Sequence, residues 1–414
     1  MNKPLSGIKV VELSTFIAVP ACARFFADQG ADVIKIEAKG GDPVRWNGTS
    51  EGRVDCPYEN TTFDLENANK RGLVLNLKDP KGKEILFKLL ADTDVFLTNW
   101  RPQALAKAGL DYESLHEKFP KIVYGTLTGY GDKGPDKDLP GFDFTAYWAR
   151  GGFMDQLRQK DEWPINLIPG SGDHQAGLFL AAGCMAALFS AQRTGIGQKV
   201  SSNLLHSSIF IQAIMVQAAQ YPEIGRPWPV SRMDANNPFN VTYRTKDQRF
   251  LQLSMPPFDV YYPKFMPLIG REDLVGNPRY TMANITEQGL NREFIQIVCD
   301  AIEQKTVKEW AEIFTANDIP FAVAQTWEEV LEDKQARAAD VFYDMDYPTG
   351  NTRSLVRQPV FVGDDLPEYK MGPLLGEHSE EIIKELGYSD EDVAAFHASG
   401  VYNTWEDLKG FHNG

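Results

Sequence analysis

One acidic residue in the sequence stands where a nucleophile would be well placed. Asp173 lies in the segment Gly170-Ser171-Gly172-Asp173-His174, directly before the longest apolar helical pattern of the chain. An aspartyl carboxyl in water has a pKa of about 3.9, and the N-terminus of a helix favours its ionised form. The glycines before it would let a bulky acyl group approach the backbone. These features predict a carboxylate able to attack an acyl carbon.

The same position also has a purely structural interpretation. Aspartate is a preferred N-cap residue, so Asp173 is expected to cap a helix from His174 to Arg193. On position alone, the cap is the better supported of the two interpretations. His174 would be within reach as a general base, but a lone histidine beside a helix cap is more often just a polar residue.

Other patterns that carry chemistry are weaker. Gly129 to Gly134 match GxGxxG after a strand, but Pro135 and Pro140 follow where a dinucleotide site needs a helix, so we expect a polar turn. No Ser–His–Asp order, phosphate loop or metal motif is evident, and no metal is expected. Basic residues in the first 110 positions make an anionic ligand reasonable; they are Arg45, Lys70, Arg71, Lys78, Arg101 and Lys107.

Alternating strands and helices must position these residues. Helical patterns at 21–28, 82–90 and 112–118 lie between apolar runs, which predicts an α/β fold with an open, doubly wound parallel sheet. The expected strands are 8–13, 32–36, 73–77, 94–98 and 122–127. Two long helices, 174–193 and 203–220, follow. The expected division is a large domain of 1–220 completed by 322–414, a linker of 221–238, and a small α+β domain of 239–321.

Composition narrows the classes of function. The chain has 414 residues, 43% hydrophobic and 24% charged, and a formal net charge of -15. Its acidity is not offset by a basic block, so neither nucleic acid nor an anionic membrane is an expected partner. Four scattered cysteines indicate a reducing compartment. The apolar run 176–191 is shorter than the roughly 18 residues a membrane span needs, so a cytoplasmic protein is expected.

Several segments match, in order, the pattern of a known enzyme family. They are Leu5–Leu13, Gly30–Glu37, Gly41–Arg45, Asn69–Arg71, Leu75–Lys78, Thr98–Pro102, Thr128–Gly131, Gly172–Asp173 and Leu374–Ser379. On these segments the chain resembles the family III CoA-transferases, of the formyl-CoA transferase type. Two more segments, Glu59–Asn67 and Asp136–Asp143, are similar to the branch acting on 2-hydroxy acids, the phenyllactate and 2-hydroxyisocaproate CoA-transferases.

The resemblance implies a CoA-transferase that moves CoA from an acyl- or 2-enoyl-CoA to a 2-hydroxy acid in amino-acid fermentation. It implies that Asp173 is the nucleophile and carries CoA as an aspartyl-CoA thioester, without a prosthetic group. It also implies an interlocked homodimer. Residues expected to contact CoA are Leu75, Lys78, Asn99, Trp100 and Lys107, and those expected near the acyl group are Ile17, Phe142, Asp143 and Met255.

Three positions depart from the formyl-CoA transferase pattern. Ile17 replaces a glutamine near the acyl site, Ala38 replaces an arginine that meets the nucleotide, and residues 255–259 replace a glycine-rich loop. Together they predict an apolar acyl pocket, with Val19 and Trp148 as further wall residues, and argue against formate or oxalate as substrate.

Two alternatives compete with this interpretation. A 2-methylacyl-CoA racemase would pair the aspartate with a histidine in a Gly-His-Asp motif, but this chain has Gly141-Phe142-Asp143, and phenylalanine cannot exchange a proton. A non-catalytic CoA-binding protein would keep the basic residues, but it has no need for Asp173 between glycines and a helix.

Overall fold

The computed structural model describes residues 3–54, 56–224 and 228–410. These residues form two compact units: the first unit comprises 1–153, 166–220 and 335–414, and the second comprises 154–165 and 221–334. The second unit is therefore larger than the expected small domain. It takes in the described residues of the expected linker 221–238, of which 225–227 lie outside the described residues, and residues 322–334, expected to belong to the large domain.

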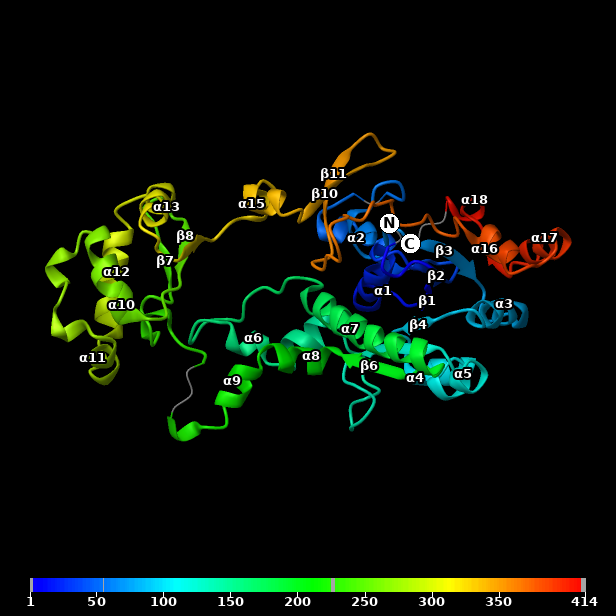
Figure 1. The fold of residues 1–414 in the computed structure, drawn as a ribbon, viewed down its shortest axis with the longest axis horizontal. Helices are drawn as coiled ribbons and strands as arrows, with labels where there is room; N and C mark the ends of the chain where they lie inside the picture. The colour runs from blue at the N-terminus through cyan, green and yellow to red at the C-terminus, as the bar shows by residue number, and fades with distance from the viewer. Residues whose placement is uncertain (1–2, 55, 225–227, 411–414) are drawn as a thin grey trace. The chain divides into compact units, whose positions relative to one another are not determined.

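A seven-stranded sheet forms the centre of the first unit, in the order β12-β3-β2-β1-β4-β5-β6 (Figure 1). Six strands are parallel, but the short edge strand β12 runs antiparallel to β3, so the sheet is mostly rather than wholly parallel. The strands are β1 (Lys9–Leu13), β2 (Asp32–Glu37), β3 (Arg71–Leu75), β4 (Val95–Thr98), β5 (Val123–Thr128), β6 (Lys199–Asn203) and β12 (Tyr402–Asn403).

Helices cover both faces of the sheet, which explains why its central strands are almost continuously apolar. Apolar residues of one face pack in a single core with α3, α4, α5, α16 and α17. On the other face lie α1 and α7 (Figure 1). These helices are α1 (Ala18–Asp28), α3 (Pro80–Leu90), α4 (Pro102–Ala108), α5 (Tyr112–Lys118), α7 (Ser171–Thr194), α16 (Ser379–Glu385) and α17 (Asp390–Ala398).

Small residues let α7 lie very close to its neighbours. A Cβ on Gly177 would approach the carbonyl oxygen of Ala18 in α1 to 2.3 Å, and one on Gly125 in β5 would approach Cys184 Sγ of α7 to 2.8 Å. By length and composition, α7 is the one described helix apolar enough to cross a membrane. Its packing on α1, β5 and β6 instead makes it part of the core of the first unit.

Two elements differ from the sequence prediction. Strand β6 was not predicted, because its sequence KVSSN lacks an apolar pattern; its hydrogen bonds to β5 decide its structure. The helix expected over 203–220 is two helices, α8 (Leu204–Ile211) and α9 (Ala213–Ala218). Gln212 lies at the break, where its side-chain amide donates to the carbonyl of Gly151.

Several further elements complete the first unit, besides the short 3-10 helices η1 (Pro43–Arg45) and η2 (Thr49–Glu51). They are α2 (Thr61–Asn67), the π-helix η3 (Asp143–Ala149), β10 (Phe342–Asp346), β11 (Thr352–Val356) and α18 (Trp405–Leu408). Strands β10 and β11 pair antiparallel. The helices α6 (Phe153–Gln156) and α15 (Lys334–Ala338) span the boundaries between the units.

The second unit has its own core around a three-stranded antiparallel sheet. Residues of the expected linker belong to this core: Met233 and Ala235 pack against it, and the Asn237 side chain donates to the carbonyl of Met255 at 3.1 Å. Its elements are β7 (Thr242–Arg244), β8 (Phe250–Leu253), β9 (Phe321–Val323), α10 (Phe258–Leu268), α11 (Met282–Glu287), α12 (Asn291–Ile302), α13 (Val307–Ala316) and α14 (Trp327–Leu331).

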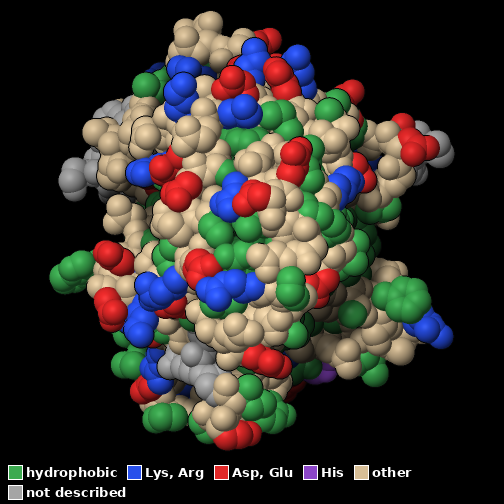
Figure 2. Space-filling view, turned by 90° about the vertical axis from the view of Figure 1, so that its left-hand side faces the viewer, with side chains coloured by type: hydrophobic (Ala, Val, Ile, Leu, Met, Phe, Trp, Pro, Cys, Tyr) green, Lys and Arg blue, Asp and Glu red, His purple; other side chains and the backbone are tan. Residues whose placement is uncertain are grey.

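Charged side chains of both signs are mixed on the surface. On the face shown in Figure 2, Lys and Arg lie among Asp and Glu, and the described side chains there form no block of one sign. Mixing of this kind gives a polyanion no extended basic surface to follow on that face.

Candidate active site

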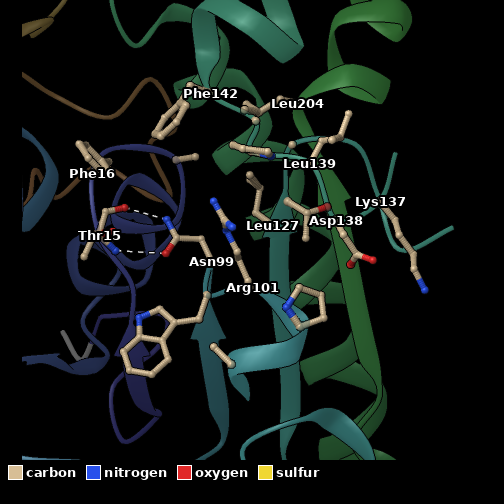
Figure 3. A pocket seen from close by; sticks show the side chains of 18 of the residues that line it. Thr15, Phe16, Asn99, Arg101, Leu127, Lys137, Asp138, Leu139, Phe142 and Leu204 are labelled. Atoms are coloured by element: carbon tan, nitrogen blue, oxygen red, sulfur yellow. Dashed lines mark hydrogen bonds between the residues drawn. The ribbon is translucent and has the colours of Figure 1, made fainter. Parts of the chain in front are cut away.

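The strand order places a cleft in the first unit. In a doubly wound sheet, ligands bind beyond the carboxyl ends of the strands, where the winding reverses. Here the reversal lies between β1 and β4, which are neighbours in the sheet. The chain leaves β1 at Ser14 and β4 at Asn99, and a cavity of about 380 Å³ opens there (Figure 3). Asp173 is among the residues that line this cavity.

A second cavity of about 440 Å³ lies beyond the ends of β1, β2 and β3. It shares Thr15 and Trp100 with the first cavity. The two cavities are therefore adjacent and together offer space for a ligand much longer than a simple carboxylic acid. Two exposed lysines, Lys39 and Lys78, line the second cavity and bring positive charge to it.

The loop after β1 forms the wall common to both cavities. The amide of Asn99 receives the Thr15 N–H at 3.2 Å and donates to the Thr15 carbonyl at 2.7 Å (Figure 3). The next residue, Phe16, has a φ of 65°, a left-handed conformation that is costly for a phenylalanine. Its N–H donates to Asp42 Oδ1 at 3.0 Å. These bonds hold the Phe16 ring against Phe142, edge to face at 5.9 Å between centroids.

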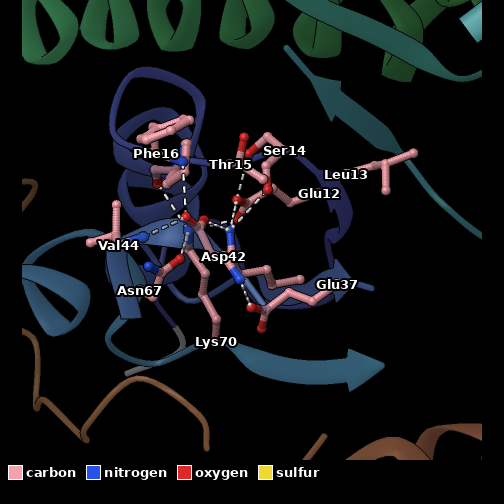
Figure 4. Close-up of polar contacts among 12 residues, drawn as sticks. Glu12, Leu13, Ser14, Thr15, Phe16, Glu37, Asp42, Val44, Asn67 and Lys70 are labelled. Atoms are coloured by element: carbon pink, nitrogen blue, oxygen red, sulfur yellow. Dashed lines mark hydrogen bonds and ion pairs between the residues drawn. The ribbon is translucent and has the colours of Figure 1, made fainter. Parts of the chain in front are cut away.

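Behind this loop, a buried ion network joins β1 and β2 to the loop after β2 and to Lys70, the residue before β3 (Figure 4). Glu12 of β1 accepts from Lys35 of β2 at 2.8 Å and from Lys70 at 2.6 Å. Lys35 also pairs with Asp42 at 3.0 Å, and all four side chains are buried. Asp42 thus links the network to the backbone of Phe16, and the buried charges set the shape of the cavity wall.

The charge states within the network follow from burial and partners together. Burial alone would raise the pKa of Glu12, but Lys35 and Lys70 outweigh it and lower that pKa to about 2. Burial would lower the pKa of Lys35, but Glu12 and Asp42 raise it instead. For Lys70 burial prevails, and its pKa falls to about 8. Glu12 and Lys35 therefore stay charged across the neutral range.

The first turn of α7 differs from the sequence prediction. The helix begins at Ser171, with Gly170 at the N-cap position in a left-handed conformation of φ 77°. Its N-terminal N–H groups are capped by Asp143, whose two oxygens accept from Gly170 and Gly172, each at 3.0 Å. The prediction that Asp173 caps the helix was therefore wrong. Asp143 takes that role from η3, and the Asp173 carboxyl is left without a capping bond.

Gly172 serves tight packing rather than ligand approach. A Cβ there would lie 2.3 Å from Asp143 Oδ1 and 2.3 Å from Tyr147 Cγ. The open side of this glycine is thus filled by the protein itself, contrary to the expectation that it would admit an acyl group.

Asp173 has the environment of a reactive carboxyl. Burial raises its pKa to about 7; the charge of Asp143 adds to the rise, and His174 opposes it. Contrary to the expectation from its position at a helix N-terminus, Asp173 is therefore not a fully ionised carboxylate at neutrality. A raised pKa makes an aspartate a stronger nucleophile once it is deprotonated, and such shifts are frequent at functional sites.

The residues predicted for CoA divide between the two cavities. Leu75 and Lys78 line the second cavity, Asn99 the first, and Trp100 both. Lys107 is exposed on α4 and lines neither.

The residues predicted for the acyl group are less closely gathered. Ile17 and Phe142 line the first cavity. Asp143 lies behind it as the helix cap, and Val19 and Trp148 are buried in the core. Met255 is fully buried in the core of the second unit, so its side chain belongs to that core.

Three of the predicted phosphate-contacting basic residues are engaged in ion pairs. Arg45 pairs with Glu37 at 2.7 Å, Lys70 with Glu12, and Arg71 with Asp32 at 2.7 Å. Arg45 and Lys70 are also buried, so they stabilise the fold rather than meet a ligand. Among the described residues, no group of three or more His, Cys, Asp or Glu side chains is arranged to hold a metal ion.

Sequence reasoning missed Phe16, Lys39 and Glu66. Phe16 and Lys39 follow β1 and β2 directly, and loops at the carboxyl ends of such strands are where ligand residues gather. The position of Phe16 and Lys39 after these strands is the sequence signal that could have identified them. Glu66 lies in α2, and its carboxyl contacts His174, with 2.6 Å between Oε1 and Nε2. No spacing rule predicts that contact.

A cavity at the switch point with a carboxyl on its wall, and a second cavity that adjoins it, suit an enzyme that handles a long acyl thioester. In agreement with this, the chain belongs to CoA-transferase family III, whose family model matches residues 5–379. It is therefore an enzyme whose substrates are CoA thioesters and carboxylic acids. This confirms the family predicted from the sequence segments.

Relatives cover nearly the whole chain. The cinnamoyl-CoA:phenyllactate CoA-transferase of Clostridium sporogenes is 54% identical over 389 residues, 94% of each protein. The (R)-2-hydroxy-4-methylpentanoate CoA-transferase of Clostridioides difficile is 42% identical over 402 residues, 96% of this chain and 99% of that protein. The crystal structure of a CAIB/BAIF family protein from Brucella suis matches with a TM-score of 0.79 and 28% identity, covering 93% of this chain and 100% of that one.

The buried network predicts a large effect of Lys35→Met. The substitution leaves Asp42 and Glu12 buried with one partner fewer, and breaking a buried pair in this way costs about 3–5 kcal/mol of unfolding free energy. Urea denaturation would measure it. The matched control is Lys81→Met, which removes the exposed ion pair with Glu84 and should cost less than about 1 kcal/mol. Equal losses in the two variants would contradict a structural role for the network.

Proposed function

We propose that this protein transfers CoA from an acyl- or 2-enoyl-CoA to a 2-hydroxy acid through an aspartyl-CoA thioester on Asp173. The observation that carries the proposal is the environment of the Asp173 carboxyl. This carboxyl has a raised pKa, makes no capping bond to the helix, and lies on the wall of a cavity that adjoins a second one. The named substrates of the two transferases at 54% and 42% identity support the acid class. A cytoplasmic location and the absence of a prosthetic group are part of the proposal.

The chemistry needs two acyl exchanges at one carboxylate. An oxygen of Asp173 attacks the thioester carbonyl of the donor, the C–S bond breaks, and a mixed anhydride and CoA thiolate result. The thiolate then attacks the aspartyl carbonyl and releases the donor acid, which leaves the aspartyl-CoA thioester. The acceptor carboxylate repeats these steps in reverse. Because the thioester energy is conserved at each step, no external energy source enters the reaction.

The cavities suggest how the substrates would lie. The phosphates of CoA would occupy the second cavity, near Lys39 and Lys78, and the thioester would reach Asp173 past Thr15 and Trp100. In this arrangement Lys39 would take over the contact that an arginine at position 38 makes in formyl-CoA transferases.

A racemase is disfavoured by the same geometry. Phe142, at the position of the racemase histidine, has an apolar ring packed on Phe16 and cannot move a proton. His174, the nearest histidine in sequence, has its Nε2 on Glu66.

Replacing the nucleophile gives the first test of the function. Asp173→Asn should fold normally, since Asp143 rather than Asp173 caps α7, while CoA transfer should fall by several orders of magnitude. In the wild type, acyl-CoA without acceptor should leave CoA attached at Asp173, seen by mass spectrometry of the peptide 170–175 after borohydride or hydroxylamine trapping. A variant that keeps substantial transfer, or an unmodified wild-type peptide under turnover, would refute the mechanism.

The first cavity predicts selectivity for large apolar acids. Ile17, Phe16 and Phe142 form an apolar part of its wall whose side chains offer no hydrogen bond to a small dicarboxylate. Burying one apolar side chain against it contributes roughly 1.5–3 kcal/mol. Phenyllactate and 2-hydroxyisocaproate should therefore exceed lactate by about ten- to a hundredfold in kcat/KM, with oxalate and formate poor acceptors.

Phe16→Ala should lower the ratio of kcat/KM for phenyllactate to that for lactate several-fold. Phe250→Ala, an exposed aromatic of the second unit, is the control. If oxalate were the best acceptor, the substrate assignment would be wrong, but the proposed role of Asp173 would not be affected.

We also propose a homodimer. Helices α7, α8 and α9 expose large apolar side chains that a monomer would leave in water: Phe189 is 65% exposed, Phe210 63% and Ile214 83%. Contiguous exposed apolar residues mark interaction surfaces.

If the subunits are interlocked, they cannot separate without unfolding. Sedimentation at nanomolar concentration should therefore show only the dimer, and Phe210→Asp should lower the yield of dimer on refolding from urea. A stable, folded monomer at that concentration would contradict the proposed assembly.

A further inference from the structure

A buried carboxyl faces the residue next to the nucleophile. Glu66 of α2 and His174 of α7 meet at 2.6 Å between Oε1 and Nε2. The Glu66 side chain is only 1% exposed, and its other oxygen, Oε2, is buried without a hydrogen-bond partner among the described residues. A buried carboxylate needs a compensating charge. The contact with Glu66 therefore favours the doubly protonated, cationic form of the imidazole.

His174 is the cation available to the nucleophile. The groups that face Asp173 are Asp143 from η3, Glu66 from α2 and His174 from its own helix. Both carboxyls disfavour a charge on Asp173, and only the imidazole favours one. The buried lysine Lys70 directs its Nζ to Glu12, Asn67 and the carbonyl of Pro20. The pair thus supplies the positive charge in a cluster of three carboxyls.

The protonation equilibria agree with this geometry. Burial would lower the pKa of His174, but Glu66 outweighs it, with help from Asp173 and Asp143, and the pKa is raised. The imidazole charge in turn limits the rise of the Asp173 pKa that burial and Asp143 cause.

We propose that Glu66 and His174 are a positioning pair for CoA transfer: Glu66 holds His174 as an imidazolium beside Asp173, and that charge keeps Asp173 in the carboxylate form that attacks the thioester. His174 does not line the cavity, so it acts through Asp173 and not by touching the substrate. The inference rests on the proposed role of Asp173 as nucleophile.

The pH dependence of transfer tests the pair. Because the carboxylate is the reactive form, kcat/KM of the wild type should fall as the pH drops below about 7, the pKa of Asp173. His174→Gln keeps a hydrogen-bond donor toward Glu66 but removes the charge, so this acidic limb should move up by about one pH unit. At pH values below the limb, a shift of one pH unit corresponds to about a tenfold loss of kcat/KM. Near pH 9 the activity should approach that of the wild type.

Two further variants separate charge from structure. Glu66→Gln loses the partner that holds the imidazolium but also removes a carboxylate that raises the Asp173 pKa, so its limb should move less than that of His174→Gln. In the His174→Gln background only the second effect remains, and adding Glu66→Gln should move the limb back down. His174→Lys restores a cation and should move the limb back toward the wild type. The control is His206→Gln, an exposed histidine of α8, which should leave the profile unchanged. Circular dichroism would verify that each variant is folded.

The outcomes are distinct from those that test the function. If Asp173→Asn abolishes transfer and the thioester is trapped, but His174→Gln and Glu66→Gln lose the same fraction of activity at every pH, the pair is structural and this inference is wrong. The inference also fails if His174→Lys is no better than His174→Gln below pH 7. If Asp173→Asn stays active, the proposed function itself fails.

Discussion

The buried pairing of Lys35 with Glu12 and Asp42 is the interaction on which the rest of the site depends. Burying charged groups is expensive, and the network contributes less to stability than well-packed apolar residues would. Because each buried charge needs a partner, the network fixes how the segments that carry these side chains meet. Asp42 pairs with Lys35 and also accepts the N–H groups of Phe16 and Val44. The strained Phe16 conformation, and with it the cavity wall, is therefore stabilised by charges inside the sheet layer.

The start of α7 shows a related division of roles between two aspartates. A helix N-terminus has unsatisfied N–H groups and attracts a carboxylate. Asp143, a residue from η3, satisfies two of them and thereby spares Asp173 from capping. Asp173 stays in the same turn, half-buried and beside the charge of Asp143, so that its carboxyl gains little from the helix and keeps a high pKa. One carboxyl fixes the geometry of the helix start, and the other is left without a capping bond.

One family framework can serve different acids. Asp173 and the strands β1 and β2 lie in the segments that carried the family resemblance, whereas Ile17 and Phe142, which line the first cavity, lie outside those segments. These side chains project from loops beyond the sheet, where substitution costs little of the core packing. Under the proposed function, substrate choice can thus change without a change of the fold or of Asp173.

The sequence by itself determined the alternation of strands and helices and the family, and it singled out Asp173 as a candidate nucleophile, because these depend on local periodicity and on contiguous motifs. Only the tertiary structure decided which charges are buried. Arg45 and Lys70 were expected to contact a ligand but lie in ion pairs. Asp173 was expected to cap α7, but Asp143 caps that helix instead. The contact of Glu66 with His174 joins positions 108 residues apart. The partner of a charged side chain is set by how distant segments pack, and neither its pKa nor its role can be derived from the residues next to it in the chain.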